Sequence, residues 1–136
     1  MSQAINERAG GGAGSTGKVF NIVLWVLQIA AAAMFLMAGF SKLLGNPQMV
    51  AMFDAIGVGQ WLRYLTGALE VGGAILLVVP RTSGLGALVL AFVMVGAVLT
   101  HLLILGGSPL IAIVLLMVTV FIAWGRRGRA RRLLQR

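Results

Sequence analysis

The chain has no cysteine and only one histidine among its 136 residues. Without thiols, disulfide bonds, thiolate zinc sites and iron–sulfur clusters are excluded, and a single histidine cannot by itself hold a metal or a haem. Charged residues make up only 10% of the chain, and three of them are acidic. We therefore predict no metal site, no catalytic residue and no intrinsic cofactor, so that any redox role would need a bound cofactor or a partner subunit.

Hydrophobic residues are abundant instead, at 60% of the chain, and the mean hydropathy is +1.00. Soluble domains have an apolar fraction of about 45–50%, so this composition indicates an integral membrane protein. The net charge is +8, but six of the eleven basic residues follow Trp124. A basic tail on so apolar a chain typically sets topology and contacts anionic lipid headgroups. The charge therefore favours membrane lipids, and not nucleic acid, as a partner.

Four apolar runs follow a Gly-rich segment, residues 1–18, for which we predict a flexible cytoplasmic tail. About 20 residues cross a bilayer, and the runs approach or exceed that length at about 19–44, 61–79, 84–105 and 109–124. The first run exceeds the apolar core of a signal peptide, which favours a retained span. We predict an all-α fold, an integral membrane four-helix bundle over 19–124, with a basic cytoplasmic tail at 125–136.

The segment between the first two spans is too short to cross a membrane. Asn46 and Pro47 form a helix-start signal, and Gly57 marks an end. Apolar residues share one face of the intervening segment: Met49, Val50, Phe53 and Ile56. We predict a short interfacial helix between spans 1 and 2, serving either as a connector or as a lid over the bundle.

Basic residues are distributed unequally between the two ends of such a bundle. The terminal side carries the two tails and Arg81, whereas the other side carries only Lys42 and Arg63. Because positive charge marks the cytoplasmic side, we predict a multi-pass protein of the cell inner (plasma) membrane with both termini in the cytoplasm.

Small and polar residues recur at steps of four and three along the first span, which predicts one face turned into the bundle. They are Gln28, Ala32, Phe35, Gly39 and Lys42.

One carboxylate, Glu70, lies near the middle of the second span. Arg63 is about two helical turns earlier on the same face, while Lys42 and His101 fall late in outward-running spans. An acid at membrane depth is costly, so it marks a buried partner or a working site. We predict a ligand-binding or proton-handling site made of Glu70, Lys42, Arg63 and His101, opening outward. The alternative is that Glu70 is paired by a neighbouring cation and only fixes helix packing.

Three stretches resemble the DoxX family of small four-helix membrane proteins. They are AGFSKLLG at Ala38–Gly45, YLTGALEVGGAILL at Tyr64–Leu77 and THL at Thr100–Leu102. The resemblance implies a four-helix membrane bundle that is often associated with quinone-linked oxidoreductases. It also makes Lys42 and Glu70 the family-defining polar residues of this chain.

These observations lead to one main functional hypothesis and two alternatives. The main hypothesis is a small membrane subunit or accessory of a quinone-linked oxidoreductase system. It would bind a quinone or similar lipid-soluble molecule near Glu70 and support a redox-enzyme partner, without being a stand-alone enzyme. The alternatives are a small proton-coupled transporter and a non-catalytic membrane assembly protein. Homo-oligomer formation stays open.

Overall fold

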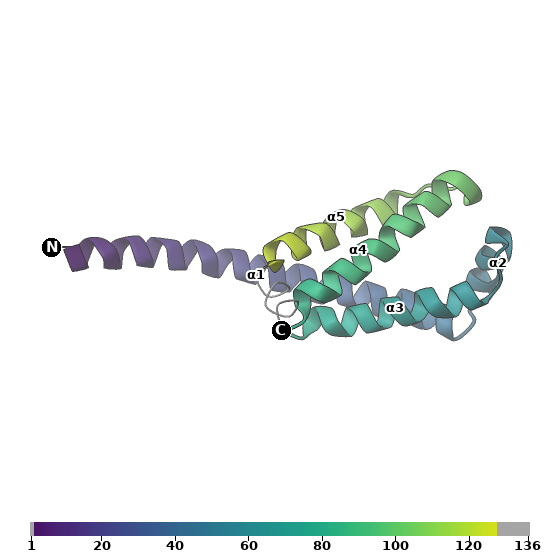
Figure 1. Ribbon diagram of the computed structural model, residues 1–136, viewed down its shortest axis with the longest axis horizontal. Helices are drawn as coiled ribbons and strands as arrows, with labels where there is room; N and C mark the ends of the chain where they lie inside the picture. Colours follow the sequence, from purple (N-terminus) through teal and green to yellow (C-terminus); the bar gives the residue numbers. More distant parts are fainter. Residues whose placement is uncertain (1, 128–136) are drawn as a thin grey trace.

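The computed structural model describes residues 2–127, with side chains from Gly17 onward, and this part of the chain is helical without any strand. Its elements are α1 (Ser2–Leu43), α2 (Pro47–Ile56), α3 (Trp61–Val78), α4 (Ser83–Thr100), the π-helical turn η1 (His101–Leu105) and α5 (Leu110–Gly125). The predicted all-α fold is confirmed, with α1, α3, α4 and α5 as its long helices (Figure 1).

Helix α1 differs from the prediction at its start, because it begins at Ser2, inside the segment expected to be a flexible tail. The N-terminal part of α1 projects well beyond the other helices (Figure 1). Residues 1–18 contain no proline that would remove a helical hydrogen-bond donor, so the backbone ladder of the first span continues through them. At the other terminus, the predicted basic tail falls mostly on residues 128–136, which lie outside the described residues.

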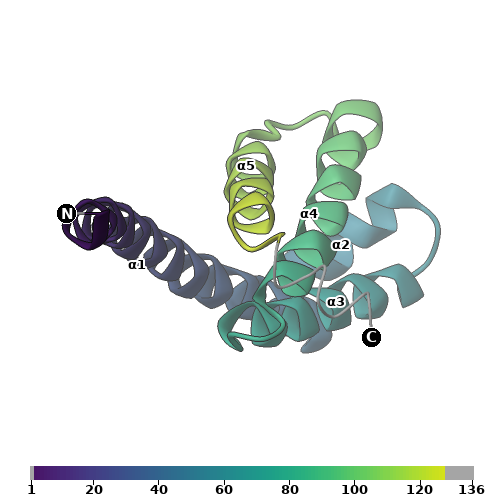
Figure 2. The same ribbon diagram turned by 60° about the vertical axis from the view of Figure 1, so that its left-hand side comes forward.

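The long helices pack as two antiparallel pairs, α1 with α3 and α4 with α5, and α3 joins the pairs by packing on α4 (Figures 1 and 2). The α3–α4 contact is closest near their connection, where a Cβ added to Gly86 would lie 2.6 Å from the backbone nitrogen of Leu77 and 2.8 Å from the carbonyl oxygen of Gly73. Small residues allow backbones to approach in this way. The two helices therefore touch tightly at one end only.

Helices α1 and α3 also approach each other closely at glycine residues. A Cβ on Gly39 would lie 2.9 Å from the carbonyl oxygen of Gly67, and one on Gly67 would lie 3.0 Å from that of Gly39. The face predicted from the four-and-three spacing of α1 is indeed the buried one, since Gln28, Ala32 and Phe35 are nearly inaccessible. This packing holds α1 and α3 side by side around the middle of the bundle.

Three helical segments are long and apolar enough to cross a bilayer, namely Gly17–Leu43, Trp61–Val78 and Ser83–Leu105. Helix α5, predicted as the fourth span, has 16 residues and so extends about 24 Å, less than a hydrocarbon core of about 30 Å. It is strongly apolar and lies along α4. The structure therefore supports a helical membrane protein with three full-length spans and a shorter fourth apolar helix.

The predicted short helix between the first two spans is present as α2. The Asn46 side chain accepts a hydrogen bond from the backbone N–H of Gln48 at 3.0 Å, and Pro47 occupies the first helical position. Gly57 ends the helix with φ at +84°, a left-handed conformation that glycine adopts without a steric penalty. Helix α2 buries Phe53 and contacts α1, α3 and η1, so it packs against the bundle end opposite the α3–α4 connection.

Candidate functional site

A buried ion pair joins the first two spans. The Nζ atom of Lys42, in the last turn of α1, lies 3.0 Å from both carboxylate oxygens of Glu70 on α3. The side chains are 13% and 2% exposed, respectively. Glu70 is thus paired, as the structural alternative anticipated, but this does not exclude a working site because the pair also borders a cavity.

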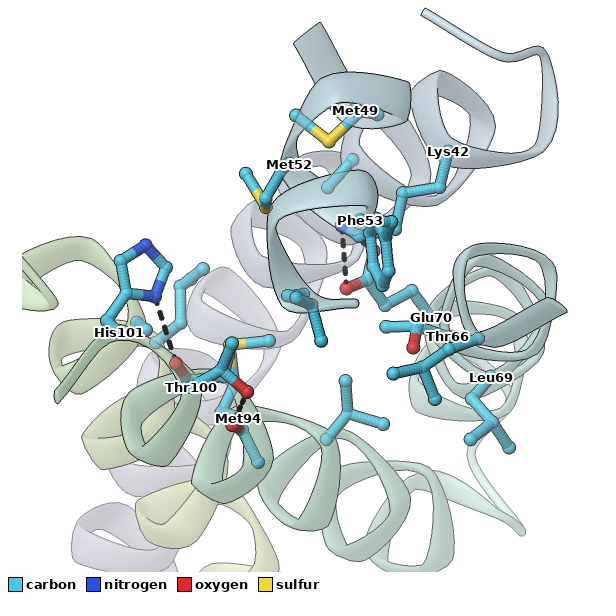
Figure 3. A pocket seen from close by; sticks show the side chains of 18 of the residues that line it. Lys42, Met49, Met52, Phe53, Thr66, Leu69, Glu70, Met94, Thr100 and His101 are labelled. Carbon is cyan, nitrogen blue, oxygen red and sulfur yellow. Dashed lines mark hydrogen bonds and ion pairs between the residues drawn. The ribbon is translucent and has the colours of Figure 1, made fainter. Parts of the chain in front are cut away.

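That cavity has a volume of about 540 Å³ and lies between the two helix pairs at the α2 end of the bundle (Figure 3). All five helices contribute to its walls: Phe35 from α1, Phe53 from α2, Leu69 from α3, Val93 from α4 and Ala112 from α5. The walls are mainly apolar. The cavity exists because α3 and α4 are drawn together by glycines only near their connection and lie apart toward α2.

The wall across the cavity from Glu70 carries His101 and Thr100 (Figure 3). The Nδ1 atom of His101 lies 2.9 Å from the carbonyl oxygen of Ala97, and since a carbonyl only accepts, Nδ1 must carry the proton. In the neutral ring, Nε2 is therefore an acceptor. His101 begins the π-helical turn, and such turns are frequent at functional sites.

Arg63, the remaining predicted site residue, does not line the cavity. Its Nη1 donates to the carbonyl oxygen of Lys42, its Nε donates to Gln60 at 2.7 Å, and its guanidinium lies 4.3 Å from the centre of the Tyr64 ring. The last carbonyls of a helix lack intrahelical partners, and a cation suits that negative end. Arg63 therefore caps α1. The structure brings Lys42, Glu70 and His101 to one cavity and places Arg63 behind it.

Gln60 extends this contact to α2. Its Nε2 donates to the carbonyl oxygen of Val50 at 3.1 Å and to the carboxylate of Asp54 at 2.8 Å, while its Oε1 accepts from Arg63. One chain of hydrogen bonds thus runs from α2 through Gln60 and Arg63 to the backbone of Lys42. This chain fixes where α2 sits relative to the buried pair.

A second buried polar cluster lies at the other end of the bundle, and sequence reasoning did not predict it. Arg126 donates from Nε to Gln28 and from Nη1 to Asn21, each at 2.8 Å, and Gln28 donates to the carbonyl oxygen of Leu77 at 2.8 Å. Arg126 had been assigned to the basic tail. The inward-facing position of Gln28 was a signal that a polar partner was needed, but nothing local identified Arg126, 98 residues away.

Charge in the cavity balances. Of the residues that line it, only Lys42 and Glu70 carry full charges when the histidine is neutral, and they neutralise each other. An isolated ion would have no opposite charge to bind there, whereas an uncharged polar group can still contact a paired ammonium or carboxylate. Among the described residues, no three His, Cys, Asp or Glu side chains group together to hold a metal ion.

Comparison with known proteins identifies the family. The sequence model of the DoxX-like family matches residues 26–125, which include most of the first span, the whole of the second, α2, the buried pair and His101. Neither the curated proteins nor the solved structures gave a significant match. Because the match covers well over half of the chain, this helical membrane protein belongs to the DoxX-like family.

Proposed function

We propose that this protein binds an uncharged, lipid-soluble small molecule, such as a quinone, in the cavity beside Glu70. It would do so as a small membrane subunit or accessory of a quinone-linked oxidoreductase system. The observation that carries the proposal is a largely apolar cavity of about 540 Å³ bordered by a buried Lys42–Glu70 pair. Small-molecule sites typically measure about 300–1,000 Å³, with apolar walls and a few placed polar groups.

The buried pair can contact a polar head group without being broken. The ammonium of Lys42 has three N–H donors, one of which donates to Oε2 of Glu70, while Nζ also lies 3.0 Å from Oε1. Another N–H can donate to a carbonyl oxygen, while the carboxylate retains lone pairs that can accept from a hydroxyl. A quinone and its reduced form present these two groups in turn. Reduction to the quinol would take two electrons from the redox-enzyme partner and two protons, and the Lys42–Glu70 pair would exchange one of these protons with the bound head group.

A packed apolar layer supports binding rather than passage across the membrane. Between the cavity and the Gln28–Arg126 cluster, the core residues are nearly inaccessible. Ala31, Ala74, Leu77 and Leu90 are among them. The buried polar residue at this level of α5 is Thr119, and its hydroxyl is directed to the carbonyl oxygens of Leu115 and Leu116 of its own helix. The arrangement fits a site that is reached from one side.

The charge distribution of the described residues supports an orientation with both termini in the cytoplasm of a plasma-membrane protein. At the α2 end, Lys42 is half-buried and Arg63 is buried, and both are engaged in contacts. Exposed basic side chains, including Lys18, Arg81 and Arg127, lie at the opposite end. Positive charge accumulates on the cytoplasmic side, where it also attracts anionic lipid headgroups. The cavity would then lie toward the outer leaflet, available to a redox-enzyme partner.

The test compares variants for quinone that copurifies and for binding of decylubiquinone in lipid nanodiscs. Glu70→Gln and Lys42→Met should each reduce both quantities by about tenfold, the effect of losing about 1.4 kcal/mol of contact. Gln28→Leu is the control, because it removes a buried polar side chain of α1 outside the cavity. Equal binding by wild type and both cavity variants would refute the proposal. Equal loss in all three variants would attribute the effect to general destabilisation and would also count against it.

A further inference from the structure

The cavity has an opening on the side of the bundle. Six residues line the cavity and are also exposed at the surface. Two of them, Ser108 and Ile111, lie just before and in the first turn of α5, and the other four are Leu65 and Leu69 of α3 and Phe92 and Gly96 of α4. Leu65 is 46% exposed and Phe92 is 78% exposed. We call the four residues of α3 and α4 the α3–α4 crevice. Both helices are long and apolar enough to span a membrane, so we expect the crevice to face lipid and not the aqueous phase.

The end of the cavity nearer the aqueous phase is covered. Helix α2 turns Met49, Met52, Phe53 and Ile56 to the cavity, and Phe53 is buried (Figure 3). Contacts of α2 with η1 and α3 hold it across that end. At this end the cavity reaches the surface only beside Ser108 and Ile111, next to the apolar roof of α2, whereas a molecule coming from the bilayer meets the apolar crevice.

The crevice also has a defined inner limit. A Cβ added to Gly73 would lie 2.8 Å from the side chain of Leu90, so α3 and α4 leave no gap at that level. Six residues separate Leu90 from Gly96, or about 9 Å along the α4 axis. The opening therefore occupies the half of α3 and α4 nearer to α2, at the level of Thr66 and Glu70.

We propose that the ligand is a tailed amphiphile whose uncharged head lies beside Lys42 and Glu70 and whose tail passes through the α3–α4 crevice into the bilayer. This inference rests on the proposed function, and it specifies the class of ligand and its route of entry. The crevice is lined by leucine and phenylalanine side chains, which suit an isoprenoid or alkyl chain. The opening also explains how a long molecule can use a cavity of only about 540 Å³, because its tail stays outside.

The tail should increase the apparent affinity mainly by keeping the head group in the membrane, and little by burying its own apolar surface. Lipid chains are as apolar as leucine, so moving a tail from bilayer to crevice gains little. The tail instead concentrates the head group in the membrane and directs it to the opening. A test must therefore block the crevice and leave the head-group contacts intact.

A substitution of Gly96 can block the α3–α4 crevice in this way. A Cβ at Gly96 would meet nothing within 4 Å, so the backbone accepts a side chain there, and in Gly96→Trp the indole would occupy the crevice. Gly72 provides the matched control: it is an exposed glycine of α3, a Cβ there also meets nothing within 4 Å, and it does not line the cavity. Decylubiquinone and its tail-less parent quinone serve as probes in phosphatidylcholine nanodiscs, with concentrations expressed per lipid.

We expect Gly96→Trp to weaken decylubiquinone binding by about tenfold, as an overpacked site would, while Gly72→Trp binds like the wild type. The tail-less quinone should bind Gly96→Trp nearly as well as it binds the wild type. A decylubiquinone carrying a diazirine at the end of its tail should label peptides of α3 and α4 near the crevice.

Three results would overturn the inference. If Gly96→Trp and Gly72→Trp bind decylubiquinone equally, or if the diazirine labels α2, the tail does not use the crevice, although loss of binding in Glu70→Gln would still uphold the proposed function. If the wild type binds neither probe, the proposed function and the inference fall together.

Discussion

Replacing only one partner of the Lys42–Glu70 pair should lower the free energy of unfolding far more than replacing both partners. Each carboxylate oxygen lies 3.0 Å from Nζ, and at an effective dielectric constant of about 20 this corresponds to roughly 5 kcal/mol of attraction. Desolvating two ions costs several kcal/mol each, so the net contribution of the intact pair is small. The removal of one partner leaves the other buried without compensation.

The expected magnitudes follow from burial. Lys42→Met leaves the carboxylate of Glu70, which is 2% exposed, and should cost about 3–5 kcal/mol of unfolding free energy. Glu70→Gln leaves an ammonium that is 13% exposed and borders the cavity, and should cost less, about 1–3 kcal/mol. The double variant Lys42→Met, Glu70→Leu should be close to the wild type, because well-packed apolar replacements of buried pairs are often neutral.

Reversible unfolding in mixed detergent micelles, followed by far-ultraviolet circular dichroism, measures these free energies. A double-mutant cycle made of Lys42→Met, Glu70→Leu and their combination should give a coupling energy of at least about 2 kcal/mol. As a control, Lys42→Met combined with Gln28→Leu should be additive, because the two residues are about 21 Å apart along α1. A coupling below about 0.5 kcal/mol for Lys42 and Glu70 would refute the reasoning.

Three further predictions concern the surroundings of the site. Arg63→Met should lower unfolding free energy by about 2–3 kcal/mol, since it removes a charged donor from the end of α1, but binding of decylubiquinone by the folded protein should stay within about twofold of wild type. Gly86→Ala should cost about 2–3 kcal/mol in the same unfolding assay because its Cβ meets backbone atoms, whereas Gly72→Ala should be neutral or stabilise by up to about 1 kcal/mol. Gln28→Leu should cost about 1–3 kcal/mol in that assay and leave binding unchanged.

Local patterns in the sequence were sufficient where short-range chemistry decides the structure. Asn46, Pro47 and Gly57 predicted the bounds of the short helix, since capping involves residues within one turn of the helix end. Periodicity predicted the buried face of the first span for a similar reason. The length of each apolar run predicted three full-length spans, whereas α5 is shorter than a full span and the Gly-rich start of α1 continues as helix.

Contacts between distant segments were beyond such patterns. Spacing placed Arg63 and Glu70 on one face of α3, but only Glu70 lines the cavity. Arg63 instead donates a hydrogen bond to the carbonyl oxygen of Lys42, which has no partner within α1 because it lies in the last turn. The partnership of Gln28 with Arg126 likewise depends on how α5 ends beside α1. The spacing of residues along one helix does not predict which residue of another helix a side chain will contact.

The α1–α3 pair is fixed at both of its ends, and this determines which cavity wall can move. Arg63 of α3 caps the last turn of α1, and Gln28 of α1 donates to Leu77 in the last turn of α3. These reciprocal contacts lie about 21 Å apart, measured from Arg63 to Leu77 along α3. Helix α4, by contrast, is held to α3 by close glycine contacts only near their connection. We therefore expect any closure around a ligand to come from the half of α4 nearer to α2, because the α1–α3 wall that carries Lys42 and Glu70 is held at both ends.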